Sequence, residues 1–322
     1  MTAPAISAEH LARSFGSTRA LVDVSLDVPA GSVCALLGRN GAGKTTAVRI
    51  LTTLLPADGG HALVDGLDVA THADQVRTRI GVTGQTATMD ELLTGSENLE
   101  TIGRFCHLGA AASRRRADEL LHQFDLVGAG KQLVKHYSGG MVRRLDLAAS
   151  LVAEPEVLFL DEPTTGLDPV GRGEVWASIR TLVAGGTTVL LTTQYLDEAD
   201  RLADTIVVID RGLVVAQGTP EQLKASIGRP FVRVALAGAD AATVERVRQL
   251  LGREAEVHGR SVSAPADNGL VTLGEVVAQL RQLGVPIDEV GLELPSLDEV
   301  FTTVTDHSAN AGRMATTQVD ES

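Results

Sequence analysis

The sequence predicts an α/β fold, with a largely parallel sheet covered by helices, followed by a small α+β domain. Between residues 156 and 218, short apolar runs typical of buried strands alternate with segments typical of helices. Near residue 38, an apolar run leads through a glycine-rich loop into a helical pattern. From residue 229 the order of elements changes to one typical of a separate small core.

The first half of the chain is expected to contain strands and then helices. Residues 6–35 have the alternation and the β-branched residues of short strands, with a turn at 29–31. Residues 96–152 have helical patterns that Pro155 ends. The strands and helices of the alternating region follow, with strands at 156–161, 187–193, 205–210 and 213–218, and helices near 171–183 and 196–203.

The last third is expected to fold as its own module. It shows in order a strand, a helix, a hairpin, a helix, a strand and a final helix, at residues 231–236, 241–251, 256–264, 272–283, 288–294 and 296–304. The final helix opens with a capping box, in which Ser296 is the N-cap and Glu299 follows three residues later. The expected domains are therefore 1–225 and 226–306, with a disordered tail at 307–322.

Composition limits the classes of function. A length of 322 residues suits two domains, and a net charge of −13 argues against a general affinity for nucleic acid. Two unrelated cysteines, Cys34 and Cys106, form no disulfide framework and suit a reducing cytosol. We see no signal peptide and no apolar stretch that approaches 18 residues. Any membrane-spanning part is therefore expected on another chain.

The strongest motif is a phosphate-binding loop. Residues 38–45, Gly-Arg-Asn-Gly-Ala-Gly-Lys-Thr, match G-x-x-x-x-G-K-[ST] between a predicted strand and a predicted helix. Glycines let backbone N–H groups wrap around phosphate oxygens, and the helix N-terminus favours the same anion. Lys44 is expected to reach the β- and γ-phosphates of a nucleotide, and the Thr45 hydroxyl to bind Mg²⁺. The residues assigned to nucleotide binding here are Gly38, Asn40, Gly41, Ala42, Gly43, Lys44, Thr45 and Thr46.

Two carboxylates follow a buried strand. Residues 157–160 are apolar, and Asp161 and Glu162 come directly after them, at the strand end where ligand crevices of parallel sheets open. Asp161 is expected to hold Mg²⁺ and Glu162 to orient and polarise an attacking water. Alone this pattern is weak, because many strands end in two acids, but together with the phosphate loop it indicates nucleotide hydrolysis.

Two further sites carry polar groups near helix starts. Ser138, Gly139 and Gly140 precede a predicted helix and offer a hydroxyl and N–H groups for an anion, although a loop with a plain serine N-cap is the favoured interpretation of an isolated Ser-Gly-Gly. Gln194 follows the strand at 187–193, at the edge where Asp161 and Glu162 are expected. It is expected to act catalytically, through a hydrogen bond to the γ-phosphate, or alternatively to cap the next helix.

In this order, the motifs resemble those of the nucleotide-binding subunit of an ABC transporter, over residues 5–225. The resemblance implies an ATP-hydrolysing fold with a RecA-like core, an antiparallel β subdomain and a helical subdomain. Tyr137 to Met141 stand at the family's signature, with tyrosine in place of the usual leucine. Gln85 matches the Q-loop glutamine, a magnesium contact, and Asp168 matches the D-loop. Phe15 matches the aromatic that stacks on adenine, although a core aromatic is an alternative.

The combination with Gln194 and the C-terminal SLDEVF is more specifically similar to daunorubicin-resistance ATPase subunits. That resemblance implies ATP and Mg²⁺ as ligands and export of a drug-like or lipid-like compound through a separate permease, from the cytoplasmic side of the membrane. It also implies a head-to-tail homodimer and a C-terminal domain that stabilises or regulates it; a passive appendage is the alternative. The rival classes are a soluble ABC ATPase without a permease, a P-loop kinase or GTPase, and a nucleotide-binding scaffold that hydrolyses little.

Overall fold

The computed structural model describes residues 3–84, 89–227, 229–285, 287–302 and 305. The chain divides into two compact units, Met1–Thr219 and Pro220–Ser322, which are described separately. Helix α8 (Pro220–Ile227) opens the second unit, whereas the sequence placed the boundary at the end of this helix. The expected tail at 307–322 lies outside the described residues.

The first unit is organised around one ten-stranded sheet, in the order β5-β4-β1-β2-β10-β9-β3-β8-β7-β6. Strands β9, β3, β8, β7 and β6 are parallel neighbours, which confirms the predicted parallel sheet. Their bounds are β3 Val33–Leu37, β6 Ile80–Thr83, β7 Val157–Asp161, β8 Thr188–Thr193 and β9 Thr205–Asp210. Strands β3, β7 and β8 are buried along their whole length, as expected for strands with both faces covered.

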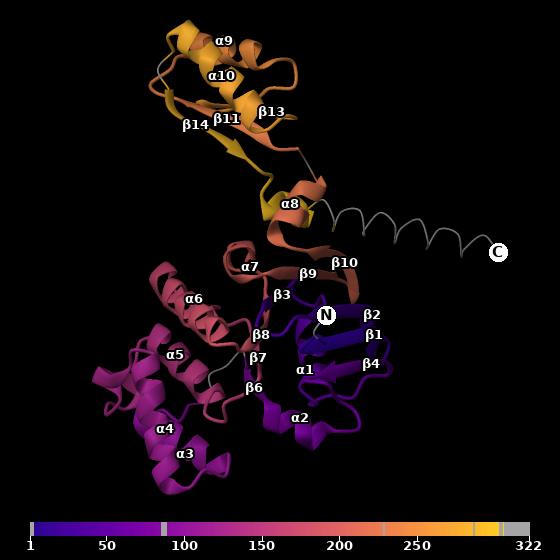
Figure 1. The fold of residues 1–322 in the computed structure, drawn as a ribbon, viewed down its shortest axis with the longest axis vertical. Coiled ribbons are helices and arrows are strands. Elements are labelled where there is room, and N and C mark those ends of the chain that lie inside the picture. The colour runs from indigo at the N-terminus through magenta and orange to yellow at the C-terminus, as the bar shows by residue number, and fades with distance from the viewer. Residues whose placement is uncertain (1–2, 85–88, 228, 286, 303–304, 306–322) are drawn as a thin grey trace, which may run out of the picture. The chain divides into compact units, whose positions relative to one another are not determined.

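The other half of the sheet is antiparallel. It contains β1 (Ile6–Phe15), β2 (Thr18–Val28), β4 (Gly59–Val64) and β5 (Leu67–Asp68). Strand β10 (Leu213–Gly218) runs antiparallel to β9 and meets β2 through a single parallel pair, Leu213 with Asp23. This pair joins the two halves, which lie around helix α1 (Lys44–Leu51) in Figure 1.

The helices of the first unit occupy the regions that the sequence predicted, except for α2 (Ala73–Arg79), which was not predicted. The helices of the 96–152 region are α3 (Gly95–Phe105), α4 (Ala110–Gln123) and α5 (Gly139–Ser150), with short 3₁₀ turns at Val127–Ala129 and Val134–His136. They form a separate group in Figure 1, beside α6 (Pro169–Ala184). The remaining helices of the unit are α2 (Ala73–Arg79) and α7 (Leu196–Leu202). This division matches the core, antiparallel and helical parts expected from the resemblance.

The second unit is an α+β fold. Its four-stranded sheet has the order β12-β13-β11-β14, with β11 Phe231–Leu236, β12 Glu256–His258, β13 Ser261–Pro265 and β14 Ile287–Glu293. Helices α9 (Ala241–Leu251) and α10 (Leu270–Leu283) pack on it around a core that includes Val234, Val262 and Leu280. The capping box is present, because Ser296 N–H donates to Glu299 Oε2 at 2.7 Å and Glu299 N–H to Ser296 Oγ at 3.3 Å. Among the described residues, no helix has the length and apolarity to cross a membrane.

Candidate active site

The phosphate loop connects β3 to α1, as the motif predicted. Gly38 can only be glycine, because a Cβ would overlap the Ile209 carbonyl oxygen of the neighbouring strand. Gly43 has φ +114, and a Cβ there would lie 2.6 Å from the carbonyl oxygen of Ala20. Gly41 also has a positive φ, +83, with open space around the position of a Cβ. The loop therefore needs glycine backbone both to pack against β9 and to turn into the N-terminus of α1.

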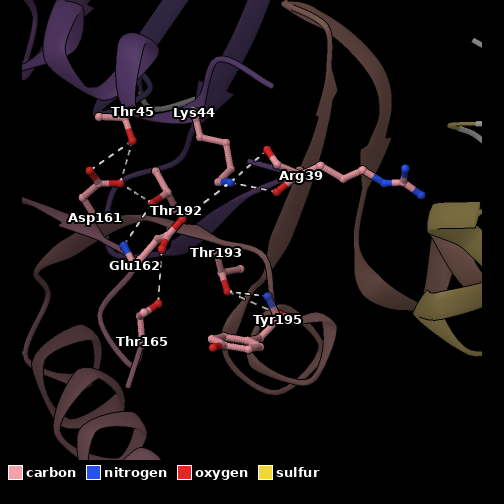
Figure 2. A network of polar contacts seen from close by, with 10 residues as sticks. Arg39, Lys44, Thr45, Asp161, Glu162, Thr165, Thr192, Thr193 and Tyr195 are labelled. Carbon is pink, nitrogen blue, oxygen red and sulfur yellow. Dashed lines mark hydrogen bonds and ion pairs between the residues drawn. The ribbon is translucent and has the colours of Figure 1, made fainter. Parts of the chain in front are cut away.

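Lys44 is the first residue of α1, and its side chain is only 4% exposed. Its ammonium donates to the carbonyl oxygens of Gly38 at 2.7 Å and Arg39 at 3.3 Å, and Nζ lies 3.7 Å from Glu162 Oε1 (Figure 2). Burial lowers the pKa of Lys44, while the nearby charges of Glu162 and Asp161 oppose that shift. The lysine thus lies between the loop that is expected to hold phosphate and the carboxylate that is expected to activate water.

Asp161 ends β7 and faces the start of α1. The Thr45 hydroxyl lies 3.2 Å and 3.1 Å from its two carboxylate oxygens, and the Thr192 hydroxyl of β8 donates to Oδ1 at 2.6 Å. Asp161 and Thr192 are register partners in the parallel sheet. A hydroxyl and a carboxylate that converge in this way are hard oxygen ligands, the donor set that Mg²⁺ prefers. These residues therefore fit a magnesium ion beside the phosphate loop.

Glu162 has a left-handed backbone, with φ +52, which is unusual for a residue other than glycine. Such a conformation costs about 1–3 kcal/mol and persists only where the surroundings hold it. Its N–H donates to the carbonyl oxygen of Thr192 at 3.2 Å and to the Thr192 hydroxyl at 3.0 Å. Its carboxylate contacts Lys44 and accepts a hydrogen bond from the Thr165 hydroxyl at 3.2 Å. The turn after β7 therefore places this carboxylate at the phosphate loop.

A cleft of about 430 Å³ lies over these groups. It is lined by Phe15, Ala20, Asn40, Gly41, Gly43, Lys44, Thr45, Thr46 and Glu162. The first turn of α1 contributes Lys44, Thr45 and Thr46 to this lining, and a helix N-terminus favours an anion. Phe15 is 47% exposed and has the Arg13 guanidinium 5.2 Å from its ring centroid, so the alternative of a core aromatic does not describe it. Polyphosphate, a flat ring and a cation all fit the residues of this cleft.

The signature residues line a second cleft, of about 340 Å³. Ser138 is the N-cap of α5, and its hydroxyl accepts a hydrogen bond from Met141 N–H at 3.2 Å. This is the geometry of a plain serine N-cap, the alternative that the sequence left open. Asp168 is the N-cap of α6 and accepts from Gly171 N–H at 2.7 Å. The cleft is lined by Ser138, Gly139, Gly140, Gly166, Leu167, Asp168, Val170, Gly171 and Glu174. It shares no lining residue with the phosphate-loop cleft.

Of the two glutamines in the predicted site, the structure describes Gln194 only. Gln194 is exposed and follows β8, two residues after Thr192, the register partner of Asp161. The next helix has Tyr195 as its N-cap, without a side-chain cap, and Thr193 Oγ1 accepts from Tyr195 N–H at 2.9 Å. Gln194 is therefore not the N-cap of this helix. Gln85 lies outside the described residues.

Three residues that the sequence interpretation did not select take part in the site. Thr192 and Thr165 hydrogen-bond to the carboxylates, and Arg143 of α5 donates to the carbonyl oxygens of the turn at 161–163. The signal for Thr192 was a polar residue in the apolar strand 189–193, because a buried hydroxyl needs a partner. Arg143 carried no local signal beyond a charge in a mostly apolar helix.

The fold and this site define a P-loop nucleotide-hydrolysing domain with a separate signature cleft. Residues 21–165 match the family model described as ABC transporter. The daunorubicin resistance ATP-binding protein DrrA2 of Streptomyces coeruleorubidus is 53% identical over 309 residues, which are 94% of this chain and 95% of that protein. The Nod factor export ATP-binding protein I of Ralstonia nicotianae is 43% identical over 220 residues, 68% of each chain.

Comparison with solved structures supports the same family. The structure of cbiO1 from Clostridium perfringens, described as part of the ABC transporter complex cbiONQ, aligns with a TM-score of 0.65 and 26% identity, covering 70% of this chain and 92% of that one. The chain therefore belongs to the ABC transporter family, as an ATP-binding subunit of the type found in drug-resistance and export systems. Such subunits hydrolyse ATP, dimerise and work with membrane permeases.

Proposed function

We propose that this chain binds and hydrolyses MgATP to energise export of a drug-like or lipid-like compound through a separate integral membrane permease. The observation that carries the proposal is the convergence of Lys44, Asp161 and Glu162 at one end of the parallel sheet. Similarity over nearly the whole chain to a daunorubicin resistance protein supports a drug-like cargo. A soluble ABC ATPase without a permease has no comparable relative among those described above.

The chemically active groups at the phosphate-loop cleft each have a proposed role. Loop N–H groups and Lys44 bind the β- and γ-phosphates, and Phe15 stacks on the base. Thr45 and Asp161 hold Mg²⁺, whose bound charge would stabilise negative charge on the phosphates; Gln85 is a further ligand. Lys44 must exchange the Gly38 and Arg39 carbonyls for phosphate oxygens, and the resulting charge-assisted bonds favour nucleotide binding.

Glu162 is the proposed general base. Its carboxylate orients and polarises the attacking water and accepts its proton, as the new oxygen–phosphorus bond forms, the bond between the γ-phosphorus and the β,γ-bridging oxygen breaks, and ADP leaves. From the end of the neighbouring strand, the side-chain amide of Gln194 donates a hydrogen bond to the γ-phosphate. An amide keeps the hydrogen bond but does not ionise near neutral pH, unlike the histidine usual in the family.

Two copies are proposed to pair head to tail, with each nucleotide between the phosphate loop of one copy and Ser138, Gly139 and Gly140 of the other. The separation of the two clefts supports this pairing, because no lining residue belongs to both. Loss of the γ-phosphate removes the contacts across the dimer, so hydrolysis shifts the equilibrium from closed to open. Asp168 would lie at the same interface.

The C-terminal module at 226–306 is proposed to stabilise or regulate this dimer, since none of the chemical motifs falls within it. The subunit would act at the cytoplasmic side of the membrane, held by its permease. Nucleic acid is not proposed as a partner, in view of the net charge of −13.

The test is co-expression with a candidate permease, followed by purification and reconstitution into proteoliposomes. We expect the two chains to co-purify, and drug-stimulated ATP hydrolysis with drug uptake into inside-out vesicles. Glu162→Gln in the same complex is the control for turnover. A chain that hydrolyses ATP at full rate but binds no permease would support the soluble class instead, and one that binds ATP without phosphate release would support a scaffold.

A further inference from the structure

All five N–H donors of Arg143 are hydrogen-bonded, three of them to the catalytic turn, the turn at residues 161–163 that carries Glu162. It lies on α5, five residues after Ser138, and is 7% exposed. A guanidinium has five N–H groups in a fixed plane. The acceptors are Pro163 O at 2.6 Å from Nε, Gly84 O at 2.9 Å and Asp146 Oδ2 at 3.2 Å from Nη1, and Asp161 O at 3.3 Å and Glu162 O at 3.2 Å from Nη2.

The charge of this guanidinium is compensated inside the protein. Burial lowers the pKa of Arg143, and the charges of Asp146, Glu198 and Asp161 oppose that shift. Arginine keeps its proton in proteins, so the group remains a cation with fixed donor directions. Asp146, one turn along the same helix and 3% exposed, completes a buried ion pair. Removing the cation alone would take one charge out of this buried ion pair, which is costly.

Three of the five acceptors are consecutive carbonyl oxygens, those of Asp161, Glu162 and Pro163. The middle residue is the one with φ +52. Carbonyls that converge on one cation define the path of the backbone between them. The opposite side of this turn is held by Thr192, which accepts from the Glu162 N–H. The left-handed conformation of Glu162 is therefore fixed from a helix on one side and from a strand on the other.

We propose that Arg143 is a positioning residue for hydrolysis, which holds the backbone of Glu162 so that its carboxylate faces the phosphate loop. This inference rests on the proposed role of Glu162. Because α5 begins at Ser138, the same helix joins the signature to the catalytic turn. A nucleotide phosphate on Ser138 and the carboxylate of Glu162 in the same copy are then linked through one rigid element, and the two ATP sites of a dimer are coupled.

The decisive variant is Arg143→Lys in the full-length protein, since lysine keeps the charge but has three donors on a single nitrogen. Arg144→Lys is the matched control. Arg144 is the adjacent residue of α5, with a 13% exposed side chain, and contacts Phe124 O at 3.1 Å and Glu174 Oε2 at 3.5 Å, away from the catalytic turn. Both variants are compared with the wild type in MgATP affinity, steady-state turnover and thermal unfolding.

We expect Arg143→Lys to keep the MgATP dissociation constant within about twofold and to lose about 10- to 100-fold in kcat, the scale for a misplaced catalytic group. Arg144→Lys should keep kcat. Near-normal turnover of Arg143→Lys would overturn the inference. So would a parallel loss of affinity, turnover and thermal stability in both arginine variants, which would indicate helix packing only.

The variant Glu162→Gln distinguishes a failure of the positioning role of Arg143 from a failure of the proposed general-base role of Glu162. If Glu162→Gln loses turnover and Arg143→Lys does not, the positioning role is wrong and the role of Glu162 stands. If Glu162→Gln retains turnover, the assignment of the general base fails, and with it the positioning role. Should Arg143→Ala fail to fold, the lysine variant still decides.

Discussion

Lys44 Nζ and Glu162 Oε1 lie 3.7 Å apart, in a site where the two side chains are 4% and 12% exposed. A cation and a carboxylate at that distance, largely removed from water, interact more strongly than an exposed pair. The lysine belongs to the helix that follows the phosphate loop and the glutamate to the turn after β7. The residue proposed to bind phosphate and the residue proposed to activate water are thus neighbours, and substitutions at the two residues should have different effects.

Replacing Glu162 by Gln should separate binding from turnover. The amide keeps the size of the side chain but removes the charge that polarises water. We expect MgATP binding to persist, hydrolysis to fall at least about 100-fold, and an ATP-bound dimer to accumulate on size-exclusion chromatography. Turnover close to that of the wild type would contradict the assigned role.

Lys44→Ala should instead weaken ATP binding itself, because the ammonium contributes charge-assisted hydrogen bonds to the phosphates. The pH dependence gives a second measurement. Burial lowers the pKa of Lys44 below its usual 10.5, so the free protein loses this proton earlier than an exposed lysine does. MgATP affinity should therefore fall as the pH rises through the lowered pKa, and Lys44→Ala should lack that component. Unchanged affinity in Lys44→Ala would count against the phosphate-loop assignment.

The unusual Tyr137 should be coupled to Gly95. The Tyr137 hydroxyl donates to the carbonyl oxygen of Ala129 at 2.8 Å, and a Cβ on Gly95 would overlap that hydroxyl oxygen. Gly95→Ala should cost about 1–3 kcal/mol by overpacking, and Tyr137→Phe about 0.5–1.5 kcal/mol by loss of the hydrogen bond. The double variant should lose less than the sum, because the phenylalanine has no hydroxyl to clash. Strict additivity in chemical denaturation would refute the coupling.

Gln194→Ala should lower turnover with little change in ATP affinity. One hydrogen bond to a charged group contributes about 1.5–3 kcal/mol, or roughly 10- to 150-fold in rate if it tightens only in the transition state. Gln194→His should keep activity, and its pH–rate profile should gain a limb that the wild type lacks. If Gln194→Ala hydrolyses ATP and supports transport normally, the residue has no part in catalysis.

Ending the chain after Thr219 should leave ATP binding intact while lowering transport or assembly with the permease. The second unit has its own core, so its removal leaves the sheet of the first unit complete. Isothermal titration with MgATP measures the first outcome, and drug uptake by reconstituted vesicles the second. Full export by the truncated chain would identify the second unit as a passive appendage.

Local sequence patterns determined most of the elements and the principal motifs. The phosphate loop, the strand that ends at Asp161 and the capping box at Ser296 are each encoded within a few neighbouring residues, so their physics is visible in the sequence. The parallel order of the central strands also followed from the alternation of strands and helices. The antiparallel strands at 59–68 carried too little periodicity to be assigned, and the boundary before α8 differs by one helix from the sequence-based one.

The tertiary structure alone decided how the catalytic turn is held. Glu162 has no glycine-like feature, and its left-handed backbone exists because Arg143, 19 positions away in the sequence, binds its carbonyl oxygen and Thr192, 30 positions away, accepts its N–H. The single pair of Leu213 with Asp23, which joins the two halves of the sheet, is likewise a contact between residues that are far apart in the sequence. Contacts of this kind depend on which segments the packed sheet brings together, whereas propensity and periodicity describe only a residue and its near neighbours.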